Sequence, residues 1–307
     1  MSAAGKAELL PAMLTPFDEE GRVETRLLRE YVDFLVGRGA DGLFALGSNG
    51  LFPLLKAEER ERAVAAVVEA AGQIPVVAHV GAATTEEAVR LARAARRAGA
   101  AAVAAVTPYY YPYDEEALRD HFLAVSEAAG DLPVYLYTIP THARNEVTPA
   151  LLRRLAAELP NLAGVKDSSR DFAHVQATLS AAAEVGRPLA VFVGTESHLL
   201  AALTLGATGA VSGVANVFPE ALRAVERAWH QGSPVEAVEA QRRLDRLRAI
   251  LGEGPAISPH YAALRWRGLD LGRPPRPIRP LGSAEEARLR ARLREEGWLE
   301  EADAAGR

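Results

Sequence analysis

Residues 76–106 read VVAHVGAATTEEAVRLARAARRAGAAAVAAV, and this stretch contains the pattern that decides the fold. A short apolar run ends at His79, an amphipathic stretch with helical spacing covers residues 84–98, and a second apolar run ends at Val106. Apolar runs this short, bounded by residues such as Gly and Pro, are typical of buried parallel strands. Gly99 lies between the helix and the second run, as expected where a helix ends in a left-handed residue. The stretch therefore predicts one strand–helix–strand unit.

The same pattern repeats along most of the chain. Apolar runs end at eight places, namely Leu14, Leu46, His79, Val106, Tyr137, Val165, Val193 and Ser212. Helical patterns follow them at residues 25–38, 57–71, 84–98, 115–129, 148–158, 171–183, 197–205 and 219–231. Such an alternation predicts an α/β fold, a (β/α)8 TIM barrel. The competing fold, an open doubly wound sheet, would need a G-x-G-x-x-G phosphate loop after the first strand, and none occurs there.

The alternation stops at about Gly232. Helical patterns cover residues 234–251, 255–266 and 284–297, and a proline-rich stretch at residues 272–280 interrupts them. We expect a barrel over residues 1–231 and a helical C-terminal extension over residues 232–307 that packs on the barrel. The Arg-rich tail is interleaved with Glu, which indicates a solvated helix face.

The composition limits the classes of function. The chain has 307 residues and a net charge of −5, which argues against nucleic acid as the main partner. It has no Cys, which excludes disulfides and thiolate chemistry, and its His residues show no metal-ligand spacing. Its longest apolar runs are about nine residues long, well short of a membrane span, and its first residues lack an export-signal pattern. We therefore expect a cytoplasmic protein that acts on small molecules, without a cofactor or metal.

Lysine is rare in this chain, and one lysine lies where barrel enzymes do their chemistry. The 35 basic residues include only three lysines, Lys6, Lys56 and Lys166. Lys166 follows the sixth apolar run, and active sites of TIM barrels lie at the C-terminal ends of the strands. Desolvation there would lower the pKa of its ammonium and leave a nucleophilic amine. The alternative is a structural lysine paired with Asp167.

Three further strand ends carry candidate residues. Tyr137 ends the fifth run, where its phenol could move protons, or where it could be an ordinary core aromatic. Residues 109–111 are three successive tyrosines, which indicate a pocket or a subunit interface. Residues 47–50 read Gly-Ser-Asn-Gly, a turn whose backbone N–H groups could hold a carboxylate or phosphate, although an ordinary turn has the same pattern.

Four ordered motifs resemble those of the dihydrodipicolinate synthase / N-acetylneuraminate lyase family. They are GSNG at residues 47–50, TPYYY at 107–111, LYTIP at 136–140 and GVKD at 164–167. The resemblance covers essentially the whole chain, from the LTPF of residues 14–17 to the C-terminal helices. It implies a TIM barrel with a helical extension, usually assembled as a homotetramer, that needs no metal.

The resemblance also implies roles for particular residues. Lys166 would be the Schiff-base nucleophile and Tyr137 the proton shuttle, while Tyr110 would join the proton relay of a neighbouring subunit. The substrate pocket would be formed by Gly47, Ser48, Asn49, Ser168, Thr195, Glu196 and Val211. Among these, Ser48 and Asn49 would hold the carboxylate of a 2-oxo acid.

Two departures from the family pattern bear on the substrate. True dihydrodipicolinate synthases carry an Arg two residues after the strand-end Pro, and this chain has His142 there, with Arg144 close by but out of register. The turn after the second run continues with Leu51 and not the Glu of synthases, which resembles 2-keto-3-deoxygluconate aldolases. The residues thus favour a pyruvate-dependent aldolase of 2-keto-3-deoxy sugar acids. The alternatives are a 4-hydroxy-tetrahydrodipicolinate synthase, a dehydratase, or a non-catalytic binding protein.

Overall fold

Eight parallel strands form a nearly closed barrel in the computed structural model, which describes residues 6–300. The hydrogen-bonded order is β1-β8-β7-β6-β5-β4-β3-β2. A single bridge between Ala12 and Phe44 brings the first and second strands together. The predicted (β/α)8 fold is therefore confirmed. The strands are β1 (Glu8–Pro11), β2 (Leu43–Ala45), β3 (Val76–His79), β4 (Ala102–Val106), β5 (Val134–Thr138), β6 (Leu162–Asp167), β7 (Ala190–Val193) and β8 (Gly209–Ser212).

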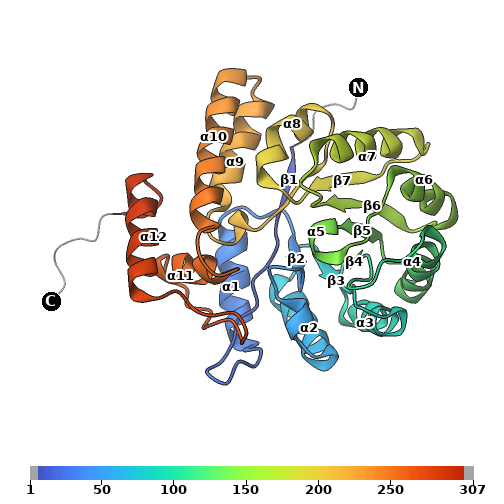
Figure 1. Cartoon of the computed structure of the whole chain (residues 1–307), viewed down its shortest axis with the longest axis horizontal. Helices are drawn as coiled ribbons and strands as arrows, with labels where there is room; N and C mark the ends of the chain where they lie inside the picture. The colour runs from blue at the N-terminus through green and yellow to red at the C-terminus, as the bar shows by residue number, and fades with distance from the viewer. Residues whose placement is uncertain (1–5, 301–307) are drawn as a thin grey trace.

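Helices surround the barrel (Figure 1). Those of the barrel are α1 (Arg26–Gly37), α2 (Ala57–Ala71), α3 (Thr85–Ala98), α4 (Glu115–Ala129), α5 (Pro140–Ala143), α6 (Pro149–Glu158), α7 (Phe172–Glu184), α8 (Leu199–Thr204) and α9 (Pro219–His230). Gly39, Gly99 and Gly206 follow three of them with φ between 83° and 96°, so the predicted left-handed exits from these helices are confirmed.

Small residues let the strands approach closely. All five residues of β4 are buried, and three of them are Ala. Gly209 of β8 is the tightest position, because a Cβ there would lie 1.8 Å from the carbonyl oxygen of Glu8 on β1. A glycine is thus required where the first and last strands pair.

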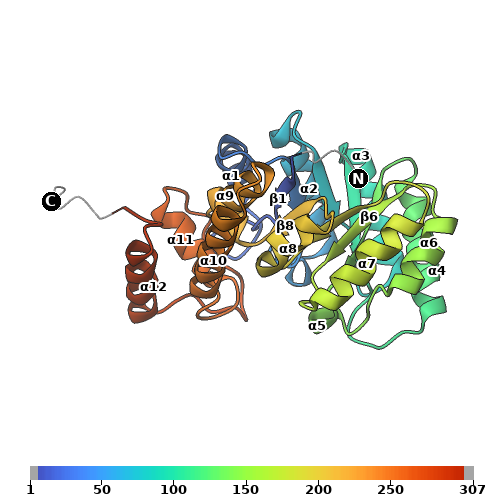
Figure 2. The ribbon, with the colours of Figure 1, turned by 90° about the horizontal axis from the view of Figure 1, so that it is seen from above.

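The chain continues in α10 (Pro234–Leu251), α11 (Ser258–Trp266) and α12 (Ser283–Glu295). Figures 1 and 2 show α10 alongside α9, with α11 and α12 on the side away from α4 and α6. Leu244, Leu247 and Ile250 of α10 are fully buried and belong to the same hydrophobic cluster as the residues of the barrel helices. The predicted boundary between the barrel and the extension, at residue 231, falls between α9 and α10. The two predicted parts also include residues 1–5 and 301–307, which lie outside the described residues.

Some predicted boundaries were wrong by a few residues. The first apolar run continues to Leu14, but β1 ends at Pro11, and beyond it an isolated bridge at Ala12 and a hydrogen bond from the Met13 amide to the Phe44 carbonyl link the segment to β2. The predicted helix at 255–266 begins at Ser258, and the short helix α5 was not predicted. No helix within residues 6–300 is long and apolar enough to cross a membrane.

Candidate active site

Lys166 lies near the C-terminal end of β6 and points into the barrel mouth. Its side chain is buried, and its Nζ lies 4.0 Å from the centroid of the Phe44 ring and 4.2 Å from that of Tyr137. Within residues 6–300 no carboxylate forms an ion pair with it. The interpretation of Lys166 as a partner of Asp167 is therefore wrong.

Asp167 has different partners, and they fix the end of β6. Its buried carboxylate accepts hydrogen bonds from the Ser169 amide at 2.9 Å and from His174 Nδ1 at 2.7 Å. The same carboxylate raises the pKa of the His174 imidazole. The second imidazole nitrogen of His174 lies 3.2 Å from the Val147 carbonyl. The strand that carries Lys166 is thus tied to the loop before α6 and to α7.

Burial lowers the pKa of the Lys166 ammonium from 10.5 to about 7, although the charge of Glu196 opposes the shift. The physical cause is loss of water around a cation that has only aromatic faces for compensation. About half of the lysine is therefore a neutral amine at pH 7. A neutral amine in a pocket is what nucleophilic attack on a carbonyl requires.

Tyr137 lies beside Lys166 on the neighbouring strand β5, in register with it. Its hydroxyl lies 3.2 Å from the Ser48 hydroxyl, and either atom can donate. Burial raises the pKa of the Tyr137 phenol, so it stays protonated near neutral pH. The pair therefore offers a phenol and a hydroxyl that can pass a proton between them.

His79 supports both aromatic neighbours of the lysine. Its ring packs edge-on against Tyr137, with centroids 5.8 Å apart, and lies 6.1 Å from Phe44. Nε2 accepts a hydrogen bond from the Val106 amide, so Nδ1 is the donor to the Leu46 carbonyl. Burial holds the pKa of His79 well below its usual value, with the charge of Arg60 as a further cause. His79 is thus a neutral support and no metal ligand or base.

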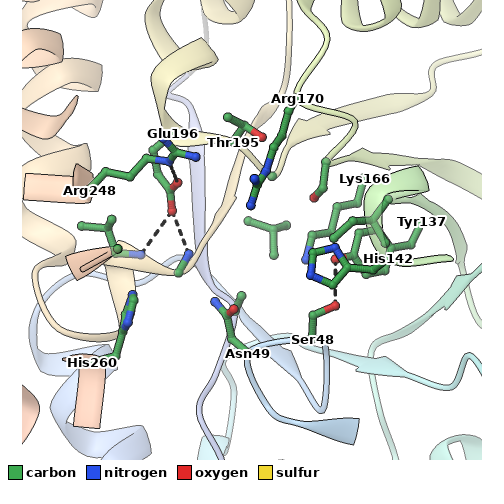
Figure 3. Close-up of a pocket in the computed structure, with 18 of the residues that line it drawn as sticks. Ser48, Asn49, Tyr137, His142, Lys166, Arg170, Thr195, Glu196, Arg248 and His260 are labelled. Atoms are coloured by element: carbon green, nitrogen blue, oxygen red, sulfur yellow. Dashed lines mark hydrogen bonds and ion pairs between the residues drawn. The ribbon is translucent and has the colours of Figure 1, made fainter. Parts of the chain in front are cut away.

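A pocket of about 530 Å³ opens above Lys166 (Figure 3). This volume lies in the range of small-molecule sites. Most residues predicted for the site line it, namely Ser48, Asn49, Tyr137, His142, Lys166, Ser168, Thr195, Glu196 and Val211. The residues to which the strand ends and the family resemblance pointed thus lie together around one pocket.

Glu196 organises the wall opposite Lys166. Its Oε1 accepts hydrogen bonds from the Ser212 hydroxyl at 2.7 Å and from the amides of Gly213 and Val214 at 2.9 and 3.2 Å. Its Oε2 lies 3.3 Å from Nε of Arg248 on α10. The carboxylate is thus satisfied within the protein and joins the barrel to the extension.

Three titratable residues of the pocket were not predicted, namely Arg170, Arg248 and His260. Arg170 follows β6 closely, so the strand-end rule could have found it. Arg248 and His260 come from α10 and α11, and nothing in their helical patterns indicates that these helices reach the barrel mouth. His260 has a pKa lowered by burial to about 4, and its Nδ1 has no hydrogen-bond partner within residues 6–300.

Three predicted or suggested residues lie outside this pocket. Gly47 does not line it; a Cβ there would lie 2.7 Å from the Phe44 ring, so the glycine makes room for that ring. Tyr110 is 72% exposed and does not reach the pocket of its own chain. Arg144, which lies close to His142 in the sequence, is also outside the lining of this pocket, whereas Arg170 is part of it.

Comparison with known proteins identifies relatives along nearly the whole chain. Residues 6–296 match the model of the dihydrodipicolinate synthetase family. The chain is 36% identical over 282 residues to the 4-hydroxy-tetrahydrodipicolinate synthase of Synechococcus sp. WH7803, covering 92% of both. It is 33% identical over 263 residues to the "Probable 2-dehydro-3-deoxy-D-pentonate aldolase YjhH" of Escherichia coli K12, covering 85% of this chain and 87% of YjhH.

A solved structure shows the same likeness in three dimensions. YagE of E. coli K12, a prophage protein of the dihydrodipicolinic acid synthase family solved in complex with pyruvate, superposes with a TM-score of 0.89. It is 28% identical in sequence, and the match covers 94% of this chain and 98% of YagE. Relatives named as synthases and as sugar-acid aldolases thus match at similar levels.

We expect pyruvate and borohydride to leave one reduced adduct on this protein, because a neutral amine in the pocket forms an imine that hydride reduces. Peptide mass mapping should place the adduct on Lys166. Lys166→Arg should abolish it without unfolding the protein, because a guanidinium cannot form the imine. Lys6→Arg and Lys56→Arg serve as matched controls and should keep it. An adduct on Lys6 or Lys56 would contradict the prediction.

Proposed function

This chain belongs to the dihydrodipicolinate synthetase family, whose members are class I, pyruvate-dependent Schiff-base lyases, and we propose that its own substrate is a 2-keto-3-deoxy sugar acid. The observation that carries the proposal is a pair of neutral imidazoles in the pocket, His142 and His260. Burial lowers the pKa of both, and the nearby Arg170 lowers that of His142 further. His142 has the Thr141 hydroxyl 3.0 Å from its Nδ1, which leaves its Nε2 for the substrate, and His260 Nδ1 has no hydrogen-bond partner within the described residues. A nitrogen of a neutral imidazole can donate or accept, which suits sugar hydroxyls.

Binding of the 2-oxo acid would begin at the turn between Gly47 and Gly50. Asn49 lines the pocket, and no described residue forms a hydrogen bond with its side-chain amide. Together with the Ser48 hydroxyl, this amide would hold the substrate carboxylate. The C2 carbonyl would then lie over Lys166, whose amine attacks it, and loss of water from the carbinolamine gives the imine.

Cleavage of the C3–C4 bond follows from the charge of that imine. The C4 hydroxyl loses its proton, the C3–C4 electron pair moves toward the iminium nitrogen, and an aldehyde leaves. Tyr137 would receive this proton while passing its own to Ser48, and Ser48 would release its hydroxyl proton to solvent, because the high pKa of Tyr137 keeps the phenol protonated before the step. Protonation of the enamine and hydrolysis then release pyruvate and restore Lys166.

Synthesis of 4-hydroxy-tetrahydrodipicolinate is the second candidate function. Arg170 favours it, because this residue places a cation in the pocket although His142 replaces the arginine of true synthases. The carboxylate of aspartate semialdehyde could bind that cation. Dehydration of a sugar acid would use the same imine and the same proton relay. A non-catalytic role fits poorly with a buried lysine whose pKa is lowered to about 7.

The two candidate reactions predict different substrate preferences. We expect kcat/KM for cleavage of 2-keto-3-deoxy sugar acids to exceed that for condensation of pyruvate with aspartate semialdehyde by at least about tenfold, ~1.4 kcal/mol. His142→Arg should lower cleavage and raise condensation, because a neutral hydrogen-bonding ring becomes a cation. Steady-state kinetics of both reactions check this. A wild-type preference for aspartate semialdehyde would disprove the sugar-acid assignment.

Assembly into a homodimer or homotetramer is part of the proposal. Tyr110 and Tyr111 are 72% and 62% exposed, and their rings pack edge-on at 4.9 Å. Tyr110 also has φ of 85°, a left-handed conformation that few bulky residues adopt. Clustered exposed aromatics are typical of protein interfaces. Tyr110 would then reach the pocket of a second copy.

Light scattering should show a dimer or tetramer at micromolar concentration. Tyr110→Asp should shift the protein toward monomer and reduce cleavage, because it introduces a charge into an apolar contact. Tyr110→Phe should keep the assembly and reveal what the hydroxyl alone contributes to the rate. A wild-type monomer with full activity would rule out the interface.

A further inference from the structure

Arg170 is an unpaired cation on the wall of the pocket. Its side chain extends from the loop after β6 into the space between Thr195 and Lys166 (Figure 3). Within residues 6–300 it forms no ion pair and no side-chain hydrogen bond. Arg248, the other pocket arginine, has Glu196 as its partner. Among the arginines that line the described pocket, Arg170 is therefore the one without a carboxylate partner.

The backbone at Arg170 adopts a conformation that favours glycine. Its φ is 63°, in the left-handed region, where a side chain costs free energy. The flanking residues hold this turn firmly, since the Ser169 amide donates to Asp167 and the Asp171 amide donates to the Ser169 hydroxyl. The turn thus presents the guanidinium to the pocket from a fixed position.

The surroundings of Arg170 do not compensate its charge. His142 lines the same pocket, and the positive charge of Arg170 lowers the pKa of its imidazole. Glu196 faces the same pocket, but Ser212, two backbone amides and Arg248 already occupy its carboxylate. Asp167 is likewise occupied by Ser169 and His174. A guanidinium left without a carboxylate in a pocket lined by polar groups is suited to an anion that arrives with the substrate.

We propose that Arg170 binds a second anionic group, a carboxylate or a phosphate, on the part of the substrate that leaves as the aldehyde. This rests on the proposed function, since it specifies the class of 2-keto-3-deoxy sugar acid. The first carboxylate lies on the Ser48–Asn49 turn, the hydroxyls face His142 and His260, and the terminal anion meets Arg170. When the C3–C4 bond breaks, the departing aldehyde carries that anion, and pyruvate remains as the enamine on Lys166.

The test compares three substrates that differ only at C6, the end of the molecule remote from the C2 carbonyl. They are 2-keto-3-deoxygluconate, whose tail is neutral, its 6-phosphate, and 2-keto-3-deoxyglucarate, which ends in a carboxylate. Wild type should cleave at least one anionic substrate with the higher kcat/KM. Arg170→Gly should lower that value by about 10- to 100-fold, as expected for loss of a charge-assisted hydrogen bond, and should lower kcat/KM for the neutral substrate by a clearly smaller factor, so that the preference for the anionic substrate is lost. Arg170→Lys should restore part of the phosphate preference.

Arg144→Gly is the matched control. Arg144 is also exposed, also has φ of 63° and lies outside the pocket, so this variant removes the same charge and the same backbone strain. It should leave all three rates unchanged, and neither glycine variant should unfold at a lower temperature than wild type.

Two outcomes separate failure of this inference from failure of the proposed function. Equal cleavage of the three substrates by wild type, or an equal loss on all three in Arg170→Gly, overturns the role of Arg170 alone. Cleavage of none of them, with rapid condensation of pyruvate and aspartate semialdehyde, overturns the sugar-acid function and this substrate class with it.

Discussion

The chemistry of this protein depends on one lysine that is buried without a carboxylate. Lys166 has the rings of Phe44 and Tyr137 about its Nζ, and burial alone moves its pKa to about 7. An ion pair would cancel that effect, because an adjacent anion favours the ammonium form. Two acidic residues near Lys166, Asp167 and Glu196, form hydrogen bonds and ion pairs with other groups. Asp167 is bound to His174, and Glu196 to backbone amides and Arg248.

The pocket divides into two parts with different origins. The strand ends of the barrel supply the reacting groups, and Tyr137 contacts both Lys166 and Ser48. The opposite wall comes partly from the C-terminal extension, through Arg248 and His260. The same Schiff-base reaction at the barrel could therefore act on different substrates in proteins whose C-terminal helices differ. The relatives named as an aldolase and as a synthase are consistent with this.

The amino-acid sequence predicted those pocket residues whose positions depend on the barrel architecture alone. Lys166, Tyr137, Ser48 and Glu196 follow strands directly, and parallel strands bring their C-terminal ends to one mouth. Arg248 and His260 could not be predicted in this way, because the packing of α10 on the barrel decides that they reach the pocket. Gly47 illustrates the opposite error: it lies in the right turn, but its role is to make room for Phe44. Arg144 and Arg170 both lie in loops after strand ends, and only the loop geometry shows which of them lines the pocket.

The most direct measurement is the titration of Lys166 itself. The chain has three lysines, so protein labelled with ¹³C at the lysine Cε gives three resonances, and the one lost in Lys166→Arg is identified at once. Because burial favours the neutral amine, this resonance should show deprotonation as the pH rises through about 7. A Lys166 resonance that stays in the ammonium form above pH 9 would contradict the account, since the amine would then be too scarce near neutral pH to act as the nucleophile.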